Sequence, residues 1–112
     1  LEAVQAFLHG VPAGAGVSAV VVFHLDPTAK SLLPEVLVKS ANVPVTEAAD
    51  GVRLEPDRVY TAPAHSIVTL KDGVFRLLPL ESAPDRRTPI DRTLHSVAAD
   101  QRGRAAAVIL SG

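Results

Sequence analysis

A largely apolar, β-branched run at residues 17–23 constrains the fold of this chain more than any other feature of the sequence. The run shows no polar alternation of the kind that marks a strand with one solvated face. Such a pattern is typical of a strand covered on both faces in a parallel sheet. His24 follows directly and is expected at the carboxyl end of this strand.

The segments around this strand alternate between helical and extended patterns. Apolar spacing predicts a helix over residues 1–8, closed by Gly10 and Pro12. Ser31 is a candidate cap for a second helix through Leu37, with Pro34 in its first turn. Two further strands are expected near residues 43–48 and 58–62.

The second half of the chain carries stronger local signals. Two alternating segments, 66–70 and 74–77, flank Lys71-Asp72-Gly73, which predicts an antiparallel hairpin. Thr88-Pro89-Ile90-Asp91 is a capping box that begins a helix closed by Gly103, and residues 105–110 are expected to form a second buried strand. The order predicts an α/β fold: a doubly wound, mainly parallel, three-layer Rossmann-like sheet with an antiparallel hairpin insertion.

Composition narrows the class of protein. The chain has 112 residues, a formal net charge of −1 and no cysteine, which fits a single domain over residues 1–112 and excludes a disulfide framework or a cysteine nucleophile. It contains no methionine and opens at Leu1, so we expect a fragment of a longer protein, truncated at both ends. The near-neutral charge argues against nucleic-acid binding, and no apolar run is long enough to insert in a membrane.

His24 is the candidate catalytic residue. An imidazole at the carboxyl end of a strand in an open parallel sheet lies where active sites form, and it can exchange a proton near neutral pH. A lone histidine is more often a packed or surface side chain, so that interpretation stays open beside the catalytic one. His9, His65 and His95 lack metal-ligand spacing, and the sequence predicts no metal and no other cofactor.

Other polar features have plainer interpretations. Gly14-Ala15-Gly16 precedes a strand, whereas phosphate-binding loops follow one, so we interpret it as a flexible turn. Arg86-Arg87 could bind an anion or simply be solvated. Asp91 could be catalytic, but its place in the capping box explains it. Ser111-Gly112 could belong to an oxyanion loop or be a turn after the strand.

Taken in order, short motifs along the whole chain resemble the catalytic domain of CheB-type chemotaxis protein-glutamate methylesterases, in the version found fused to methyltransferases. Each motif is unspecific alone, but their colinear order is specific. They are residues 21–27 (VVFHLDP), 31–35 (SLLPE), 47–51 (EAADG), 55–56 (EP), 59–60 (VY), 89–92 (PIDR) and 108–112 (VILSG).

The resemblance implies a cytoplasmic enzyme with a Ser-His-Asp triad that hydrolyses glutamate methyl esters on chemoreceptors and, in some members, deamidates glutamine. His24 matches the triad histidine. The family serine would precede Leu1 and the aspartate would follow Gly112, so this fragment is expected to be inactive. Ser18 and Ser111 match neither residue.

Two alternatives remain. The family commonly has glutamine where this chain has Phe23, so the parent protein could instead be a non-catalytic regulatory or receptor-binding domain of a larger signalling protein. A nucleotide-binding module is the weaker option, because no glycine fingerprint follows a strand. The expected partners are a methylated chemoreceptor or receptor-like protein and receiver or methyltransferase domains in the same polypeptide, with no nucleic acid and no membrane insertion.

Overall fold

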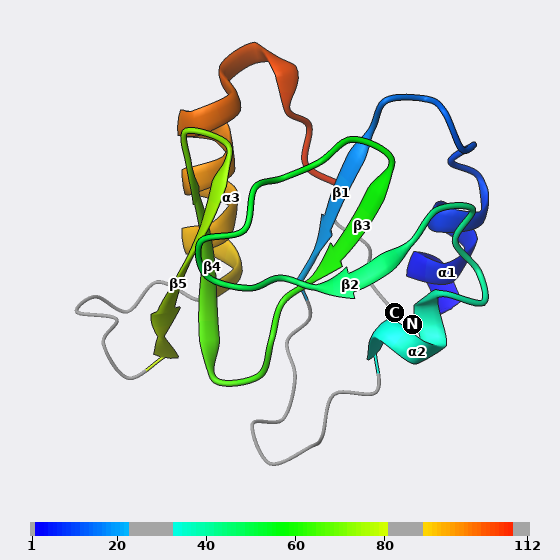
Figure 1. Cartoon of the computed structure of the whole chain (residues 1–112), viewed down its shortest axis with the longest axis horizontal. Coiled ribbons are helices and arrows are strands. Elements are labelled where there is room, and N and C mark those ends of the chain that lie inside the picture. Colours follow the sequence, from blue (N-terminus) through cyan, green and yellow to red (C-terminus); the bar gives the residue numbers. More distant parts are fainter. Residues whose placement is uncertain (1, 23–32, 81–88, 109–112) are drawn as a thin grey trace.

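The computed structural model describes residues 2–22, 33–80 and 89–108 of the chain, and Figure 1 shows their arrangement. Three α-helices, five strands and a final 3-10 turn follow one another in these ranges. In chain order they are α1 (Glu2–His9), β1 (Ser18–Val21), α2 (Leu33–Leu37), β2 (Val45–Glu47), β3 (Arg58–Thr61), β4 (Ser66–Lys71), β5 (Val74–Pro79), α3 (Pro89–Gln101) and η2 (Arg102–Arg104).

β1, β3 and β2 form a parallel sheet in that spatial order, with β3 in the middle. The predicted strand over residues 17–23 is confirmed for Ser18–Val21, and the predicted strands near 43–48 and 58–62 are confirmed as β2 and β3. The α/β class, with a mainly parallel sheet and an antiparallel hairpin, is confirmed as well.

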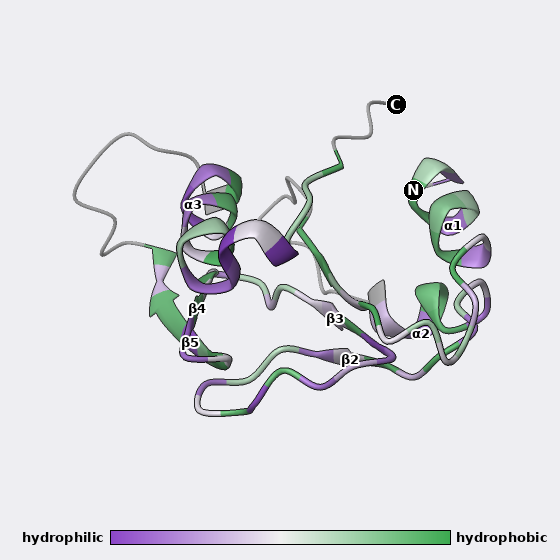
Figure 2. Cartoon of the chain, turned by 90° about the horizontal axis from the view of Figure 1, so that it is seen from above, coloured by the Kyte–Doolittle hydropathy of each residue, from purple (hydrophilic) through white to green (hydrophobic). Residues whose placement is uncertain are grey.

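Both faces of the parallel sheet are covered, as the absence of polar alternation predicted. Successive side chains of β3 point to opposite faces: Val59 packs in a cluster with Leu8 and Leu37 from the α1 and α2 side. Tyr60 packs on the other face in a cluster with Phe75 of the hairpin. Figure 2 shows the resulting three layers, with α1 and α2 on one side of the sheet and the hairpin with α3 on the other.

β4 and β5 form the predicted antiparallel hairpin, with Lys71 paired to Val74. Its two turn residues, Asp72 and Gly73, have φ of 54° and 74°. A two-residue turn with positive φ at both positions matches the right-handed twist of the strands, which is why the Asp-Gly pair predicts it.

The outer edge of β5 is covered by residues 50–54. The Gly51 N–H donates to the Phe75 carbonyl at 2.8 Å, and the Phe75 N–H donates to the Val52 carbonyl at 2.8 Å. The Leu77 N–H reaches the Asp50 carboxylate at 2.8 Å. The turn at Asp50-Gly51 therefore also ties the parallel sheet to the hairpin.

The outer edge of β4 is covered by α3. Thr93, Ser96 and Asp100 lie three and four residues apart and so share one face of this helix. The Thr93 hydroxyl donates to the Val68 carbonyl, and the Ser96 hydroxyl accepts from the Leu70 N–H at 2.9 Å. The Asp100 carboxylate accepts from the N–H groups at the hairpin turn.

The strand predicted over residues 105–110 is wrong for residues 105–108, the part that the structure describes. These four residues form no strand and are exposed, and the Val108 side chain is 56% exposed. Ala105 has extended backbone angles (φ −120°, ψ 149°), but no described strand pairs with the segment. An apolar, extended segment becomes a strand only beside a backbone partner, and its sequence pattern carries no information about that partner.

The end of α3 also differs slightly from expectation. The helix ends at Gln101 and continues as the 3-10 turn η2, in which Arg102 has a φ of 54°. The change of backbone conformation therefore precedes Gly103. The predicted caps Ser31 and Thr88 lie outside the described residues. Within the described ranges, no helix combines the length and apolar character needed to cross a membrane.

Candidate active site

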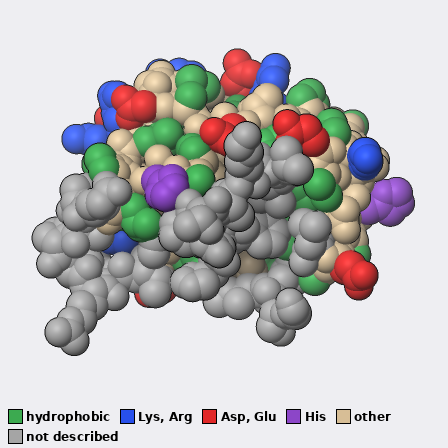
Figure 3. Space-filling view, turned by 90° about the horizontal axis from the view of Figure 1, so that it is seen from below, with side chains coloured by type: hydrophobic (Ala, Val, Ile, Leu, Met, Phe, Trp, Pro, Cys, Tyr) green, Lys and Arg blue, Asp and Glu red, His purple; other side chains and the backbone are tan. Residues whose placement is uncertain are grey.

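The carboxyl ends of the three parallel strands meet at one edge of the sheet. Val21 of β1 and Glu47 of β2 both pair with Thr61 of β3, so the last residues of all three strands share one rung. Figure 3 views the molecule from below, where the acidic, basic and hydrophobic side chains of the visible described residues are intermixed. Active sites of open parallel sheets form outside this edge.

His24 follows the strand that ends at this edge. β1 ends at Val21, three residues before the histidine, and runs in the predicted direction. His24 itself lies outside the described residues, so its catalytic role stays a prediction.

Thr61 is a polar side chain at this edge that the sequence analysis missed. It has a relative exposure of 0%, and its hydroxyl has no hydrogen-bond partner among the described residues. Burying a hydroxyl without a partner costs about 1–3 kcal/mol. The signal in the sequence was a threonine that ends the segment Val59-Tyr60-Thr61, two residues before Pro63.

His65 lies in the turn between β3 and β4, four residues beyond Thr61. Its φ is 61°, a left-handed conformation that non-glycine residues adopt uncommonly and histidine more often than most. The carbonyl of His65 accepts a hydrogen bond from the Leu80 N–H at 3.0 Å, which closes the open end of the hairpin. The side chain is exposed.

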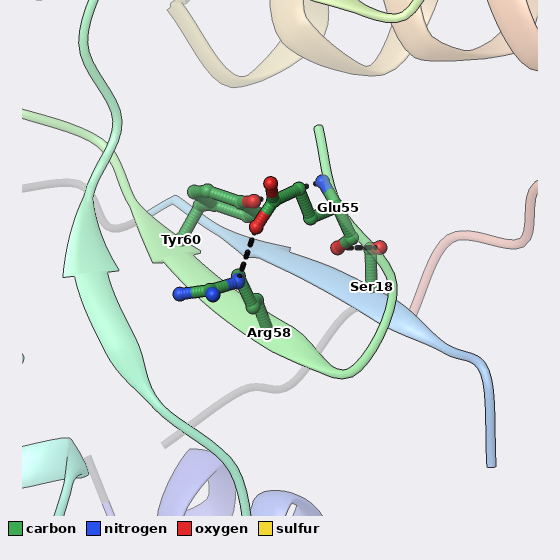
Figure 4. Close-up of polar contacts among 4 residues, drawn as sticks. All are labelled: Ser18, Glu55, Arg58 and Tyr60. Atoms are coloured by element: carbon green, nitrogen blue, oxygen red, sulfur yellow. Dashed lines mark hydrogen bonds and ion pairs between the residues drawn. The ribbon is translucent and has the colours of Figure 1, made fainter. Parts of the chain in front are cut away.

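Ser18 lies at the opposite, amino edge of the sheet. Its hydroxyl donates to the Glu55 carbonyl at 2.5 Å, and Arg58 Nε lies 2.6 Å from the Glu55 carboxylate (Figure 4). The Tyr60 hydroxyl accepts from the Glu55 N–H at 2.8 Å. Since Ser18 is three residues before Val21, about 10 Å away along the strand, it is separated from the carboxyl edge and serves to hold the loop before β3.

The glycines before β1 form a turn, as predicted. Gly14 and Gly16 have φ of 82° and 74°, and the Gly16 N–H donates to the Asp57 carboxylate at 2.9 Å. Asp57 in turn donates its own N–H to the Val17 carbonyl at 3.0 Å. The turn is thus tied to the loop before β3 at the amino edge.

The remaining candidates do not converge on one site. His9 and His95 are exposed on α1 and α3, and Asp91 is exposed in the first turn of α3. Within the described ranges, no three His, Asp or Glu side chains lie close enough to hold a metal ion. Arg86, Arg87 and Ser111 fall outside those ranges.

Asp100 of α3, which contacts the hairpin turn, is a titratable group whose pKa is shifted. Its partial burial by itself raises the pKa. Hydrogen bonds from the Gln101 side chain and from the Gly73 and Asp72 N–H groups favour the charged form, and together they hold the pKa of Asp100 below its ordinary value of 3.8. This perturbed carboxylate is explained by its structural contacts with the hairpin.

Comparison with known proteins identifies the family of this chain. A family model described as CheB methylesterase matches residues 1–112. Proteins named protein-glutamate methylesterase/protein-glutamine glutaminase are similar to this chain in Desulfotalea psychrophila (33% identity over 99% of the chain and 32% of the relative) and Bordetella avium (36% identity over 96% and 32%). The chain therefore spans about a third of the length of these relatives.

A third relative is much longer. An uncharacterised 104.1 kDa protein of Rhodobacter capsulatus is 36% identical over 71% of this chain, and the matched segment is only 8% of its length.

Proposed function

Because the chain belongs to the CheB methylesterase family, we propose that it is part of a serine-type protein-glutamate methylesterase that acts on chemoreceptors in chemotaxis signalling. The observation that carries the proposal is the family match over all 112 residues. The names of the relatives support both ester hydrolysis and glutamine deamidation as reactions of the full-length protein.

In this proposal His24 is the general base. It removes the proton from the hydroxyl of the nucleophilic serine, which attacks the carbonyl carbon of the glutamate methyl ester. The protonated imidazole then gives its proton to the departing methoxide, and methanol leaves. Water, deprotonated by the same imidazole, attacks the acyl-enzyme, and the serine is regenerated with free glutamate as the product.

The family serine and aspartate are proposed to come from parts of the longer protein before residue 1 and after residue 112. The aspartate would hold the imidazole in the tautomer that accepts the serine proton, and backbone N–H groups near the serine would stabilise the oxyanion. The parallel sheet supports this assembly, because its strands end together at the edge toward which β1 leads.

The test is methanol release from a methylated receptor by the full-length protein. We expect His24→Ala to abolish turnover and His95→Ala, which removes an exposed histidine of α3, to leave it unchanged. Unchanged turnover in His24→Ala would overturn the proposal in favour of a non-catalytic domain. Residues 1–112 alone are expected to release no methanol, since a lone triad member leaves only residual catalysis.

The proposed partners follow from the same reaction. The substrate is a methylated chemoreceptor or receptor-like protein. The length of the Rhodobacter capsulatus relative supports a protein with further domains. Receiver or methyltransferase domains in the same polypeptide are the proposed ones.

A further inference from the structure

β1 has an open outer edge in the described part of the chain. It pairs in parallel with β3 on one side, and no described strand pairs with it on the other. The Val21 carbonyl accepts a hydrogen bond of 3.1 Å from the Ala62 N–H, on the β3 side. Because the backbone groups of successive residues in a strand point to opposite sides, those of Ser18 and Val20 point to the open edge.

The other edge strand of this sheet, β2, is built differently. It has only three residues, follows Pro44 and ends with the exposed Glu47. Short length, proline and charge are the features that keep a natural edge strand from pairing further. Ser18–Val21 contains no proline and no charged residue, and its register with β3 is unbroken. β1 therefore has the sequence and geometry of an inner strand.

The helices indicate where a strand preceding α1 would lie. α2 packs on the Val59 face of the sheet, and the chain passes through it from β1 to β2, across β3. Crossover connections between parallel strands are right-handed almost without exception. α1 packs on the same face, since Leu8 contacts the cluster of Leu37 and Val59. A crossover of the same hand on the same face runs in the same direction, so a strand that leads through α1 into β1 lies beyond the outer edge of β1.

The helix layers also extend toward this edge. Figure 2 shows α1 and α3 on opposite sides of the sheet, both set off from β3 in the direction away from β2. β1 lies on that side of β3. Phe7 of α1 and Leu94 of α3 are 42% and 37% exposed, so both helices keep apolar surface uncovered. A strand added beside β1 would be covered on both faces, as strands of parallel sheets are.

We propose that the outer edge of β1 is the docking site of a further parallel strand, which belongs to the same polypeptide and directly precedes α1 in the longer protein. The same polypeptide is the occupant because this chain spans only about a third of the length of its relatives, which leaves sequence for further strands. The added strand is apolar on both faces, and its backbone pairs with Ser18 and Val20. This pairing does not depend on the esterase reaction.

The test is amide hydrogen exchange in the full-length protein, followed residue by residue by nuclear magnetic resonance. The Ala19 N–H, which points toward β3, is the internal reference and is protected whether or not the outer edge is covered. We expect the Val20 N–H, which points outward, to exchange as slowly as that of Ala19. Exchange at Val20 that is much faster than at Ala19 would show an open edge and overturn the proposal.

Nuclear Overhauser effects from the Val20 amide identify the occupant. Contacts with amides of residues that precede α1 support the proposal. Contacts with residues 105–112, with any later segment, or between differently labelled copies of the protein would overturn it. Full turnover in His24→Ala would remove the proposed function and leave this pairing in place, so the two failures are distinguishable.

Discussion

The hydroxyl of Thr93 donates a hydrogen bond of 2.7 Å to the carbonyl of Val68. This contact joins α3 to the edge of β4 that does not face β5. It is buried, because Thr93 is only 3% exposed and Val68 only 2%. The hairpin is thereby fixed to the helix through its backbone as well as through its side chains.

Thr93→Val removes this donor while keeping the shape of the side chain. The Val68 carbonyl then stays buried without that partner, which is expected to lower the free energy of unfolding by about 1–3 kcal/mol. For a domain of this size each kcal/mol lowers the midpoint of thermal unfolding by about 4 °C or somewhat more. Circular dichroism melts measure the shift, and an unchanged midpoint would show that the contact is dispensable.

The stability of the protein should depend on pH through Asp100. Its pKa is lower in the folded chain than the ordinary value of 3.8, so the charged carboxylate stabilises the fold. This contribution is fully present above about pH 5 and is lost as the pH falls below the ordinary value and through the lowered one. Urea unfolding at several pH values compares the unaltered protein with Asp100→Asn. We expect the variant to be less stable at pH 7 and the difference to shrink toward pH 2; a constant difference would contradict the assignment.

Gly73→Ala is expected to destabilise the hairpin. Gly73 has a φ of +74°, and an added Cβ would lie 3.4 Å from Arg53 Nη1. A side chain in the left-handed region costs about 1–2 kcal/mol. Gly103→Ala is the matched control, since nothing lies within 4 Å of its Cβ position and its φ is not positive. Equal unfolding midpoints for the two variants would contradict the turn geometry.

Tyr60→Phe tests the polar contacts at the amino edge. The variant keeps the ring, whose centroid lies 4.8 Å from that of Phe75, and loses the hydroxyl that accepts from the Glu55 N–H. The loss of one such hydrogen bond is expected to cost about 1 kcal/mol. Chemical denaturation measures this, and faster hydrogen exchange at the Glu55 amide would locate the effect in the loop before β3. An unaltered exchange rate would contradict a protective hydrogen bond from the Glu55 amide to this hydroxyl.

Local signals explain the elements that the sequence predicted well. The hairpin depends on Asp72-Gly73, whose positive φ values the turn requires, so two adjacent residues carry the information. The parallel strands were recognisable because covering on both faces removes polar alternation, as Val59 and Tyr60 illustrate with one cluster on each face.

The features that the sequence did not reveal depend on distant partners. Thr93, Ser96 and Asp100 form a polar stripe of the kind that usually faces water, yet each binds the β4–β5 hairpin. Thr61 became notable only when the register placed it, fully buried, between Val21 and Glu47. His24 was predicted to be the catalytic residue from its place after a strand, and it lies outside the described residues.

Both outer edges of the hairpin are covered, and this protects the protein from aggregation through its strand edges. Unpaired backbone groups along a strand are a template on which another chain can add a strand, and so they promote aggregation. Here the stripe on α3 occupies the edge of β4, and residues 50–54 occupy that of β5. Local detachment of α3 would expose Val68 and Leu70 as such a template, so the helix protects the protein in solution as well as stabilising its fold.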